Sequence, residues 1–335
     1  MRKLALVFLF LGLIHVQAQV KKVDAISITV SNMNRSVKFY SEVLGFKKTG
    51  DDELFGKDYE ELQGIFGLRM RIVRMQLGDE SIELVDYLTS GGRTIPENAK
   101  SNDLIFQHLA IVVSDMDKAY QHLRKFNVEH VSTGPQTLPE SIPEAAGIKA
   151  FYFHDPDHHN LELIYFPNGK GQIKWHQDKH GIDKKIFLGI DHTAICVNNT
   201  DSSLKFYQVL LGLMRKGDSW NKGVEQSHLN FVEDASLHIT AMRAADGPGI
   251  EFLEYLSPGP GNPYPKDSRT DDIWHWQTTL IVDDAGALYN QILHSSYQLV
   301  SKRLVYLGTR TGKKGIAFIV RDADGHAMLI RENIR

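Results

Sequence analysis

The feature that most constrains this chain of 335 residues is that it carries one sequence pattern twice. Residues 23–46 (VDAISITVSNMNRSVKFYSEVLGF) align without a gap on residues 190–213 (IDHTAICVNNTDSSLKFYQVLLGL). Further matches follow in the same order: residues 81–92 with 249–260, 106–115 with 275–284, and 151–165 with 318–332. The spacing is steady, since Tyr40 and Tyr207 lie 167 positions apart and Glu83 and Glu251 lie 168 apart. We interpret the chain as a tandem duplication of one domain.

Each half is itself double. Alternating apolar residues over 26–30 predict a strand, and apolar residues at helical spacing over 37–44 predict the helix that follows it. Residues 109–113 and 117–126 repeat this plan, and the tight-turn sequences at 155–157 and 322–325 predict the last hairpin of each half. We expect four βαβββ units, with an α+β module over 20–167, a linker over 168–185 and a second module over 186–335.

The first residues predict export. Arg2 and Lys3 precede an unbroken apolar run from Leu4 to Ile14, and the sequence Val-Gln-Ala ending at Ala18 suits a signal peptidase. A membrane anchor is the alternative, but this run is shorter than the roughly 20 apolar residues that cross a bilayer. We expect residues 1–18 to be a signal peptide, a periplasmic or secreted protein, and no membrane association after cleavage.

Composition excludes several classes of partner. Lys and Arg total 38 against 41 Asp and Glu, and the net charge of -3 supplies no basic field for nucleic acid. Cys196 is the one cysteine, so no intramolecular disulfide can form, and its apolar neighbours favour a buried role. We expect a small-molecule partner and a chain that is a monomer or a homodimer.

Taken together, the motifs resemble the vicinal oxygen chelate superfamily, the glyoxalase, bleomycin-resistance and extradiol-dioxygenase group. The motifs are a strand that begins with His, a helix ending FY-x-x-x-LG, a strand with IEL or IEF, a second strand that begins with His, and a final D-P-D-x-x-x-x-E-L. The resemblance covers nearly everything from Val23 onward and implies two incomplete β-barrels with helices outside. It constrains the reaction much less, because this scaffold hosts unrelated chemistries.

The resemblance also implies where metal ligands would lie: the first His, the Glu of IEL, the second His and the final Glu. The residues at these positions are Ala25, Glu83, His108 and Glu162 in the first half, and His192, Glu251, Gln277 and Leu329 in the second. Neither half holds a complete set.

The pairing of the units therefore decides the site. If the second unit pairs with the third, the two histidines and two glutamates converge (His108, Glu162, His192 and Glu251), and the first and fourth units keep a degenerate site (Ala25, Glu83, Gln277 and Leu329). Pairing within halves instead gives Glu83, His108 and Glu162 at one site, and His192, Glu251 and Gln277 at the other. We favour the crossed arrangement, because it concentrates the losses in one barrel.

Imidazoles and carboxylates in this combination suit Zn, Ni, Fe or Mn and leave positions open for a substrate with neighbouring oxygens. Glu162 and Glu251 are the expected catalytic residues, with Glu162 carrying a proton in a glyoxalase-like reaction. We expect Tyr255, Trp276 and Gln277 to line the substrate pocket, and His154, His158 and His159 to be solvated at a hairpin tip.

The sequence leaves three functions open. A metal-dependent lyase or isomerase is the favoured hypothesis. An Fe(II) extradiol-type dioxygenase using His108, His192 and Glu162 is the enzymatic alternative. A metal-free protein that binds small molecules or drugs is the third.

Overall fold

A computed structural model describes residues 19–177, 185–308 and 314–334. The expected signal peptide at 1–18 and part of the expected linker, residues 178–184, lie outside these ranges. Within them, no helix has the length and apolar character that crossing a membrane requires.

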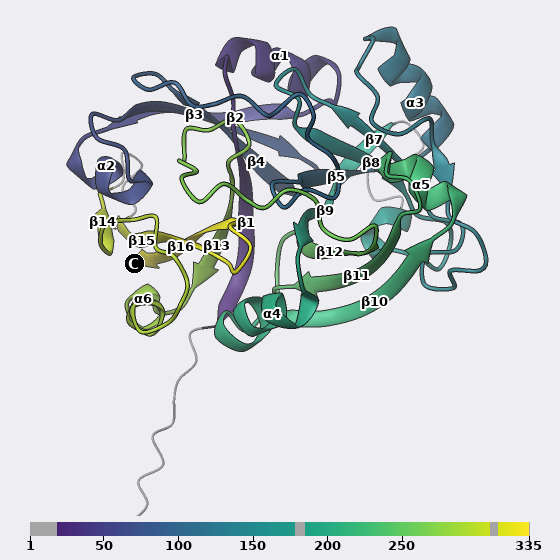
Figure 1. Ribbon diagram of the computed structural model, residues 1–335. Coiled ribbons are helices and arrows are strands. Elements are labelled where there is room, and N and C mark those ends of the chain that lie inside the picture. The colour runs from purple at the N-terminus through teal and green to yellow at the C-terminus, as the bar shows by residue number, and fades with distance from the viewer. Residues whose placement is uncertain (1–18, 178–184, 309–313, 335) are drawn as a thin grey trace, which may run out of the picture.

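The strands form two curled eight-stranded sheets, which make two incomplete barrels (Figure 1). One sheet, here called the terminal barrel, has the order β14-β15-β16-β13-β1-β4-β3-β2. Its strands are β1 (Val20–Thr29), β2 (Lys47–Phe55), β3 (Arg69–Leu77), β4 (Glu80–Tyr87), β13 (Trp276–Val282), β14 (Val305–Leu307), β15 (Lys314–Arg321) and β16 (Ala327–Ile334).

The other sheet, here called the middle barrel, has the order β10-β11-β12-β9-β5-β8-β7-β6. Its strands are β5 (Gln107–Val113), β6 (Gln136–Thr137), β7 (Lys149–His154), β8 (Asn160–Tyr165), β9 (Phe187–Val197), β10 (Met214–Lys222), β11 (Ser236–Arg243) and β12 (Gly249–Ser257). The α+β fold of two modules is confirmed.

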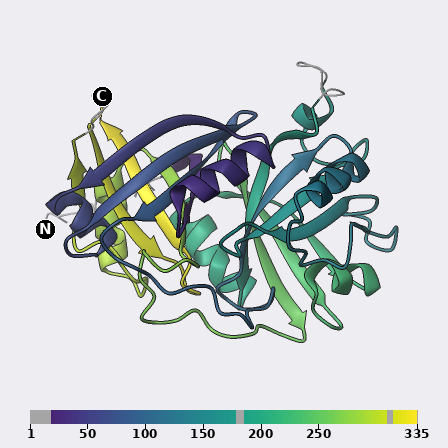
Figure 2. The ribbon, with the colours of Figure 1, turned by 90° about the horizontal axis from the view of Figure 1, so that it is seen from above.

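The units pair across the two halves of the chain. Strand β1 of the first unit lies antiparallel to β13 of the fourth, and β5 of the second lies antiparallel to β9 of the third. Seen from above, the two ends of the chain, purple and yellow, share one barrel, and the teal and green middle forms the other (Figure 2). The crossed arrangement is confirmed.

The helices lie outside the sheets, and four of them begin at side-chain caps. They are α1 (Met33–Glu42), α2 (Lys57–Gln63), α3 (Met116–Lys125), α4 (Thr200–Leu204) continued by a π-helical turn η3 (Lys205–Leu210), α5 (Val224–Asn230) and α6 (Ala285–Leu293). The helix after the first strand of each unit starts behind an Asn or Asp whose side chain accepts a backbone N–H three residues on: Asn32, Asp115, Asn199 and Asp284. This shared start reflects the fourfold repetition of one unit.

The repeated KFY and D-x-D motifs meet in the structure as a buried network. In the first module, Tyr40 Oη donates to Asp155 Oδ2 at 3.1 Å, and His159 Nδ1 lies 2.9 Å from the same oxygen. In the second module, Tyr207 and His326 contact Asp322 in the same way, at 2.9 and 3.1 Å. Because each network joins the helix of one unit to the final hairpin of the next, it links one barrel to the other.

This network corrects the expectation that His159 is solvated. Its ring is buried, and Nε2 lies 2.7 Å from the carbonyl oxygen of Ile273 in the other module. The turn places the imidazole beneath the hairpin, where Asp155 and that carbonyl satisfy both ring nitrogens.

Candidate metal centre

Two histidines and two glutamates converge inside the middle barrel. His108 lies on β5 and Glu162 on β8, and their counterparts His192 and Glu251 lie on β9 and β12. Across the β5–β9 ladder, each histidine faces an alanine of the partner strand: His108 opposite Ala194, and His192 opposite Ala110. Each alanine also lies beside a glutamate in the parallel ladders to β12 and β8. Small residues at these two positions leave room for the four longer side chains.

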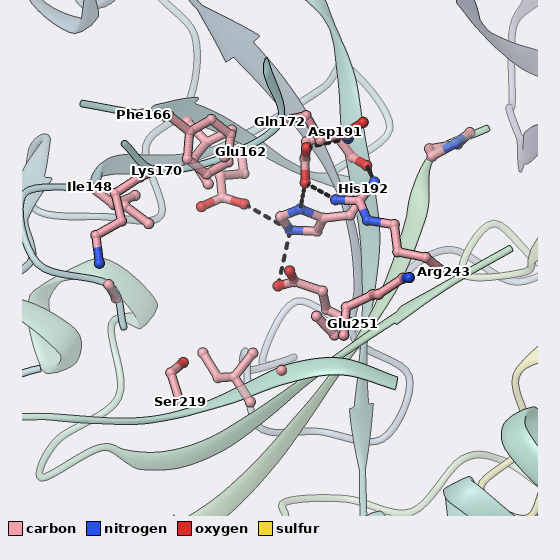
Figure 3. A pocket seen from close by; sticks show the side chains of 18 of the residues that line it. Ile148, Glu162, Phe166, Lys170, Gln172, Asp191, His192, Ser219, Arg243 and Glu251 are labelled. Atoms are coloured by element: carbon pink, nitrogen blue, oxygen red, sulfur yellow. Dashed lines mark hydrogen bonds and ion pairs between the residues drawn. The ribbon is translucent and has the colours of Figure 1, made fainter. Parts of the chain in front are cut away.

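The ligand atoms lie close to one another. His108 Nε2 is 3.3 Å from His192 Nε2 and 3.1 Å from Glu162 Oε2. His192 Nε2 is 3.5 Å from Glu162 Oε2 and 3.4 Å from Glu251 Oε2 (Figure 3). Donor atoms that share one cation through bonds of about 2.1 Å are separated by about 3.0–3.5 Å. His108, His192 and Glu162 therefore fit a first-row divalent metal, and Glu251 lies beside His192 as a fourth candidate ligand.

Burial distinguishes the two glutamates. The Glu162 side chain is 6% exposed, and with His108 and His192 it forms a fully buried group of three potential ligands. Glu251 is 22% exposed and groups with His192 and Asp191. Glu251 is therefore the carboxylate with the freer access to the cavity.

Asp191 contacts the ring nitrogen of His192 that faces away from the cluster. Its Oδ2 lies 3.1 Å from His192 Nδ1 and accepts a hydrogen bond from Arg243 Nη2 at 2.6 Å. Its Oδ1 accepts hydrogen bonds from Trp175 Nε1 and Gln172 Nε2, both at 2.9 Å. A carboxylate on Nδ1 fixes the tautomer and directs the Nε2 lone pair toward a metal.

Trp175 and Gln172 belong to the segment between the modules, which the sequence predicted to be a linker. A short 3-10 helix, η1 (Ile173–His176), buries Trp175 against the wall of the middle barrel. Connecting segments are seldom buried, because their backbone polar groups need partners. Here the buried part is an indole whose N–H donates to Asp191.

Electrostatics follow from these contacts. Burial alone would raise the pKa of Glu162, but hydrogen bonds and charge from His108 and His192 outweigh it and bring that pKa to about 2. Burial alone would lower the pKa of His192, but Glu251, Asp191 and Glu162 raise it to about 10. Three carboxylates thus surround one imidazole, an excess of negative charge that a divalent cation would balance.

The cluster opens into a cavity of about 980 Å³. Its wall mixes polar and apolar side chains, and the polar ones include Tyr152, Lys170, Ser219, Asn221 and Gln226. In Figure 3, Glu162 and Glu251 approach His192 from two sides, and Lys170 lies across the cavity. A cavity of this size with several polar groups in its wall suits a small oxygenated molecule.

The three residues expected in the substrate pocket lie elsewhere, which corrects that prediction. Tyr255 is 2% exposed and packs in an apolar cluster with its hydroxyl hydrogen-bonded to Asn230. Trp276 packs in a core and contacts the ring of His159, and Gln277 lies beside His275 in the terminal barrel. The strand that carries Trp276 and Gln277 belongs to the other barrel, a consequence of the crossed pairing.

The degenerate site has been replaced by an ion pair. In the terminal barrel, Glu83 Oε1 accepts a hydrogen bond from Arg74 Nη1 at 3.0 Å, and Glu83 Oε2 accepts one from Ser27 at 3.0 Å. Arg74 faces Glu83 across the β3–β4 ladder at the position where Ala241 faces Glu251 in the middle barrel. Ala25, Gln277 and Leu329 fill the other three positions and supply no imidazole or carboxylate.

None of the clusters of three or more potential ligands found among residues 19–177, 185–308 and 314–334 lies in the terminal barrel. Instead, the Arg74 guanidinium pairs with Glu83, the one carboxylate at a ligand position of this barrel. Neither Arg74 nor Asp191 was predicted from the sequence. The aspartate had a signal, since it stands second in both repeats, as Asp24 and Asp191.

Paired βαβββ barrels with inward histidine and glutamate side chains define a class of small-molecule-binding proteins and enzymes. The chain belongs to the Glyoxalase/Bleomycin resistance protein/Dioxygenase superfamily, whose family model matches residues 22–163 and 189–330. The two matches correspond to the two modules.

Curated relatives match one module each. A 2-epi-5-epi-valiolone epimerase from Actinomyces sp is 30% identical over 158 residues, which is 44% of this chain and 80% of the relative. An uncharacterized protein of Bacillus subtilis (strain 168) is 30% identical over 144 residues, covering 43% of this chain and 95% of the relative.

Solved structures resemble the whole chain. Glyoxalase I from Zea mays aligns with a TM-score of 0.61 at 15% identity, covering 94% of this chain and 93% of that one. A putative dioxygenase from Bacillus subtilis subsp. subtilis str. 168 gives 0.55 at 14% identity, with 95% and 86% covered. At these identities the likeness concerns the fold.

Proposed function

We propose that the protein is a metal-dependent isomerase or epimerase that acts on a small, polar substrate with neighbouring carbonyl and hydroxyl oxygens. The observation that carries the proposal is the meeting of His108, His192, Glu162 and Glu251 at one cavity. His108, Glu162 and His192 would hold the cation, and Glu251, which lies beside His192, would be a fourth ligand. When bound, a divalent cation would polarise the substrate carbonyl and acidify the adjacent C–H.

Glu251 is the proposed base, in place of the Glu162 expected from the sequence. It is the more exposed of the two carboxylates and faces the cavity, whereas Glu162 is fixed between both histidines. Its carboxylate would take the proton from the carbon next to the carbonyl. Protonation of the resulting enediolate from the opposite face, by solvent or a second acid, gives an epimer. Protonation at the former carbonyl carbon, with transfer of the hydroxyl proton to the other oxygen, gives an isomer.

The relatives support this choice of reaction class. One relative, from Actinomyces sp, is a 2-epi-5-epi-valiolone epimerase, and 80% of its length matches one module here. In the cavity wall, Ser219, Asn221 and Gln226 offer hydrogen bonds to several hydroxyl groups. A lyase reaction of the glyoxalase kind uses the same proton transfer and remains within the proposal.

An Fe(II) extradiol-type dioxygenase is the second candidate. One observation favours it: His108, His192 and Glu162 alone form a compact buried group, a two-His-one-carboxylate set. A metal-free binding protein is the outcome if the cluster holds no cation.

One set of measurements separates the three functions. Metal content of the purified chain, counted per chain, should be at least one equivalent. Incubation with α-hydroxyketones in D₂O should give deuterium at the carbon next to the carbonyl, detected by NMR, and Glu251→Gln should abolish it while keeping the metal. Oxygen consumption with catechols would instead establish the dioxygenase, and less than about a tenth of an equivalent of metal would establish the binder.

Export remains part of the proposal. It rests on the sequence of residues 1–18 alone, and N-terminal sequencing of the protein recovered from the periplasm or medium tests it. A mature chain that begins at Gln19 is the expected result.

A further inference from the structure

A second cluster of potential ligands lies at the tip of the β7–β8 hairpin, outside the centre described above. It consists of Glu129, His154 and His158. His154 Nδ1 lies 3.3 Å from Glu129 Oε1, and His158 Nδ1 lies 3.0 Å from Glu129 Oε2. We propose that these three side chains bind a second divalent cation of the kind that imidazole prefers, with Zn²⁺ as the reference ion.

The hydrogen bonding of His154 favours a cation over a simple ion pair. Its Nε2 lies 3.2 Å from Asn160 Oδ1, an acceptor, so Nε2 carries the proton. Nδ1 then presents a lone pair, and it is a buried atom without a hydrogen-bond partner. That lone pair faces a carboxylate oxygen of Glu129, an unfavourable contact that a cation between the two would make favourable.

The charge state of His154 agrees with this geometry. Burial lowers the pKa of its imidazole more than Glu129 raises it. The ring is therefore neutral near pH 7, which is the form that binds metals.

The duplication supplies an internal control for what the fold itself requires. In the second module, the residues equivalent to Glu129, His154 and His158 are Gln298, Arg321 and Gly325. The backbone N–H of Arg321 donates to the carbonyl oxygen of Gln298, as that of His154 donates to Glu129. The turn therefore forms without any ligand set. The His-Glu cluster is a property of one copy and needs a reason other than folding.

His158 shows this most clearly. Its φ is +65°, in the left-handed region, where the twin turn has Gly325 at +111°. A non-glycine residue is strained in this region, because its Cβ crowds the following carbonyl oxygen. A histidine at the position where the twin has glycine, with its ring on Glu129, is the choice expected for a ligand.

The cluster lies on the inward face of the hairpin. His154 pairs with Asn160, and the next cross-strand pair on that face is Tyr152 with Glu162. His154 therefore lies two residues, about 7 Å along the strands, from the cross-strand pair that contains Glu162 of the first centre. The second cation would lie near this end of the hairpin. It borders a separate cavity of about 690 Å³ lined also by Phe106, Trp274 and Trp276, toward which a coordination position is free.

Zn²⁺ titration of the metal-stripped full chain, followed by calorimetry and elemental analysis, tests the proposal. The intact chain should bind two equivalents. His158→Gly and Glu129→Gln, which introduce the residues of the twin turn, should each lose one equivalent and keep the circular dichroism spectrum of the parent. His108→Ala should lose the other equivalent and leave the hairpin site occupied.

Two results would overturn the proposal: a single equivalent in the parent that is lost in His108→Ala, or a second equivalent that persists in both hairpin variants. Because the two sites respond to different substitutions, failure of this site and failure of the proposed reaction are distinguishable. A crystal soaked in Zn²⁺ would show the ion by its anomalous signal between Glu129, His154 and His158.

Discussion

The middle and terminal barrels are built from equivalent units with the same strand order, yet they differ at three of the four ligand positions and at one neighbouring residue. The middle barrel has histidine or glutamate at every ligand position, and Ala241 stands opposite Glu251. The terminal barrel keeps only Glu83, and Arg74 stands opposite it. Its carboxylate is neutralised by a guanidinium inside the protein, so this barrel is complete without a cation.

The comparison shows how a duplicated domain can lose one site without losing the fold. The sheet requires apolar cores and paired backbones, and both barrels provide them. The centre requires only the inward positions at the middle of each sheet. Alanine and leucine are acceptable to the fold at two of these positions, at Ala25 and Leu329.

Removal of a candidate ligand should have the largest effect on metal affinity. A small effect would contradict the assignment of the metal site to the middle barrel. We expect His108→Ala and His192→Ala each to reduce metal affinity of the middle centre by roughly 1000-fold, well above the 10–100-fold loss typical of outer partners. Calorimetric titration measures it. Glu83→Gln in the terminal barrel is the matched control, and a similar loss there would mean that the terminal barrel also binds the metal.

The second largest effect is expected on stability, from the buried networks around Asp155 and Asp322 that join the two barrels. Asp155→Ala and Asp322→Ala each remove the acceptor for a buried tyrosine, a buried histidine and backbone N–H groups. We expect each to lower the free energy of unfolding by about 3 kcal/mol, because those donors stay buried without partners.

Urea denaturation measures this loss for the two variants side by side. Tyr40→Phe and Tyr207→Phe, which remove one hydrogen bond each, should cost about 1 kcal/mol. Equal losses in the two modules would show that these networks belong to the fold, and a loss confined to one module would contradict that view.

Asp191→Asn should weaken the metal centre without unfolding the chain. The neutral amide of asparagine interacts more weakly with His192 Nδ1 than a carboxylate does. We therefore expect metal affinity to fall by about 10–100-fold. Asp24→Asn is the matched control, because Asp24 holds the same position in the terminal barrel, where it pairs with Arg74 at 3.1 Å. An unchanged metal affinity in Asp191→Asn would exclude the positioning role of this carboxylate.

The smallest expected effect is the number of protons released when the middle barrel binds a metal. In the metal-free protein the pKa of His192 is raised to about 10, so its imidazole is charged at pH 7 and must lose a proton to bind a cation. We expect release of about one proton per metal at pH 7, and affinity that rises about tenfold per pH unit from 7 toward 10.

Calorimetry in buffers of different ionisation enthalpy measures the release. The same group contributes stability to the metal-free protein below its unfolded pKa of about 6.5, and this contribution is lost as pH rises through 10. The terminal barrel has Ala25 in place of His192 and contributes nothing to this proton count. Zero protons released would contradict the proposed charge state.

Much of the architecture could be predicted from residue patterns. The double repeat, the strand and helix periods and the turn motifs were enough for four βαβββ units, because these signals act over a few neighbouring residues. The candidate ligands could be named for the same reason: the family motifs mark them one strand at a time. The pocket wall could not, and Tyr255, Trp276 and Gln277 proved to lie in cores or in the other barrel.

The sequence by itself determined the duplication, the class of fold and the identity of the four candidate ligand residues. Only the tertiary structure decided that His108 and His192, 84 residues apart, share one centre, and that Arg74 closes the other. Pairing β5 with β9 instead of β1 with β5 is a choice between edges with nearly the same local sequence pattern. It is settled by long-range packing, the contribution that residue periodicity does not contain.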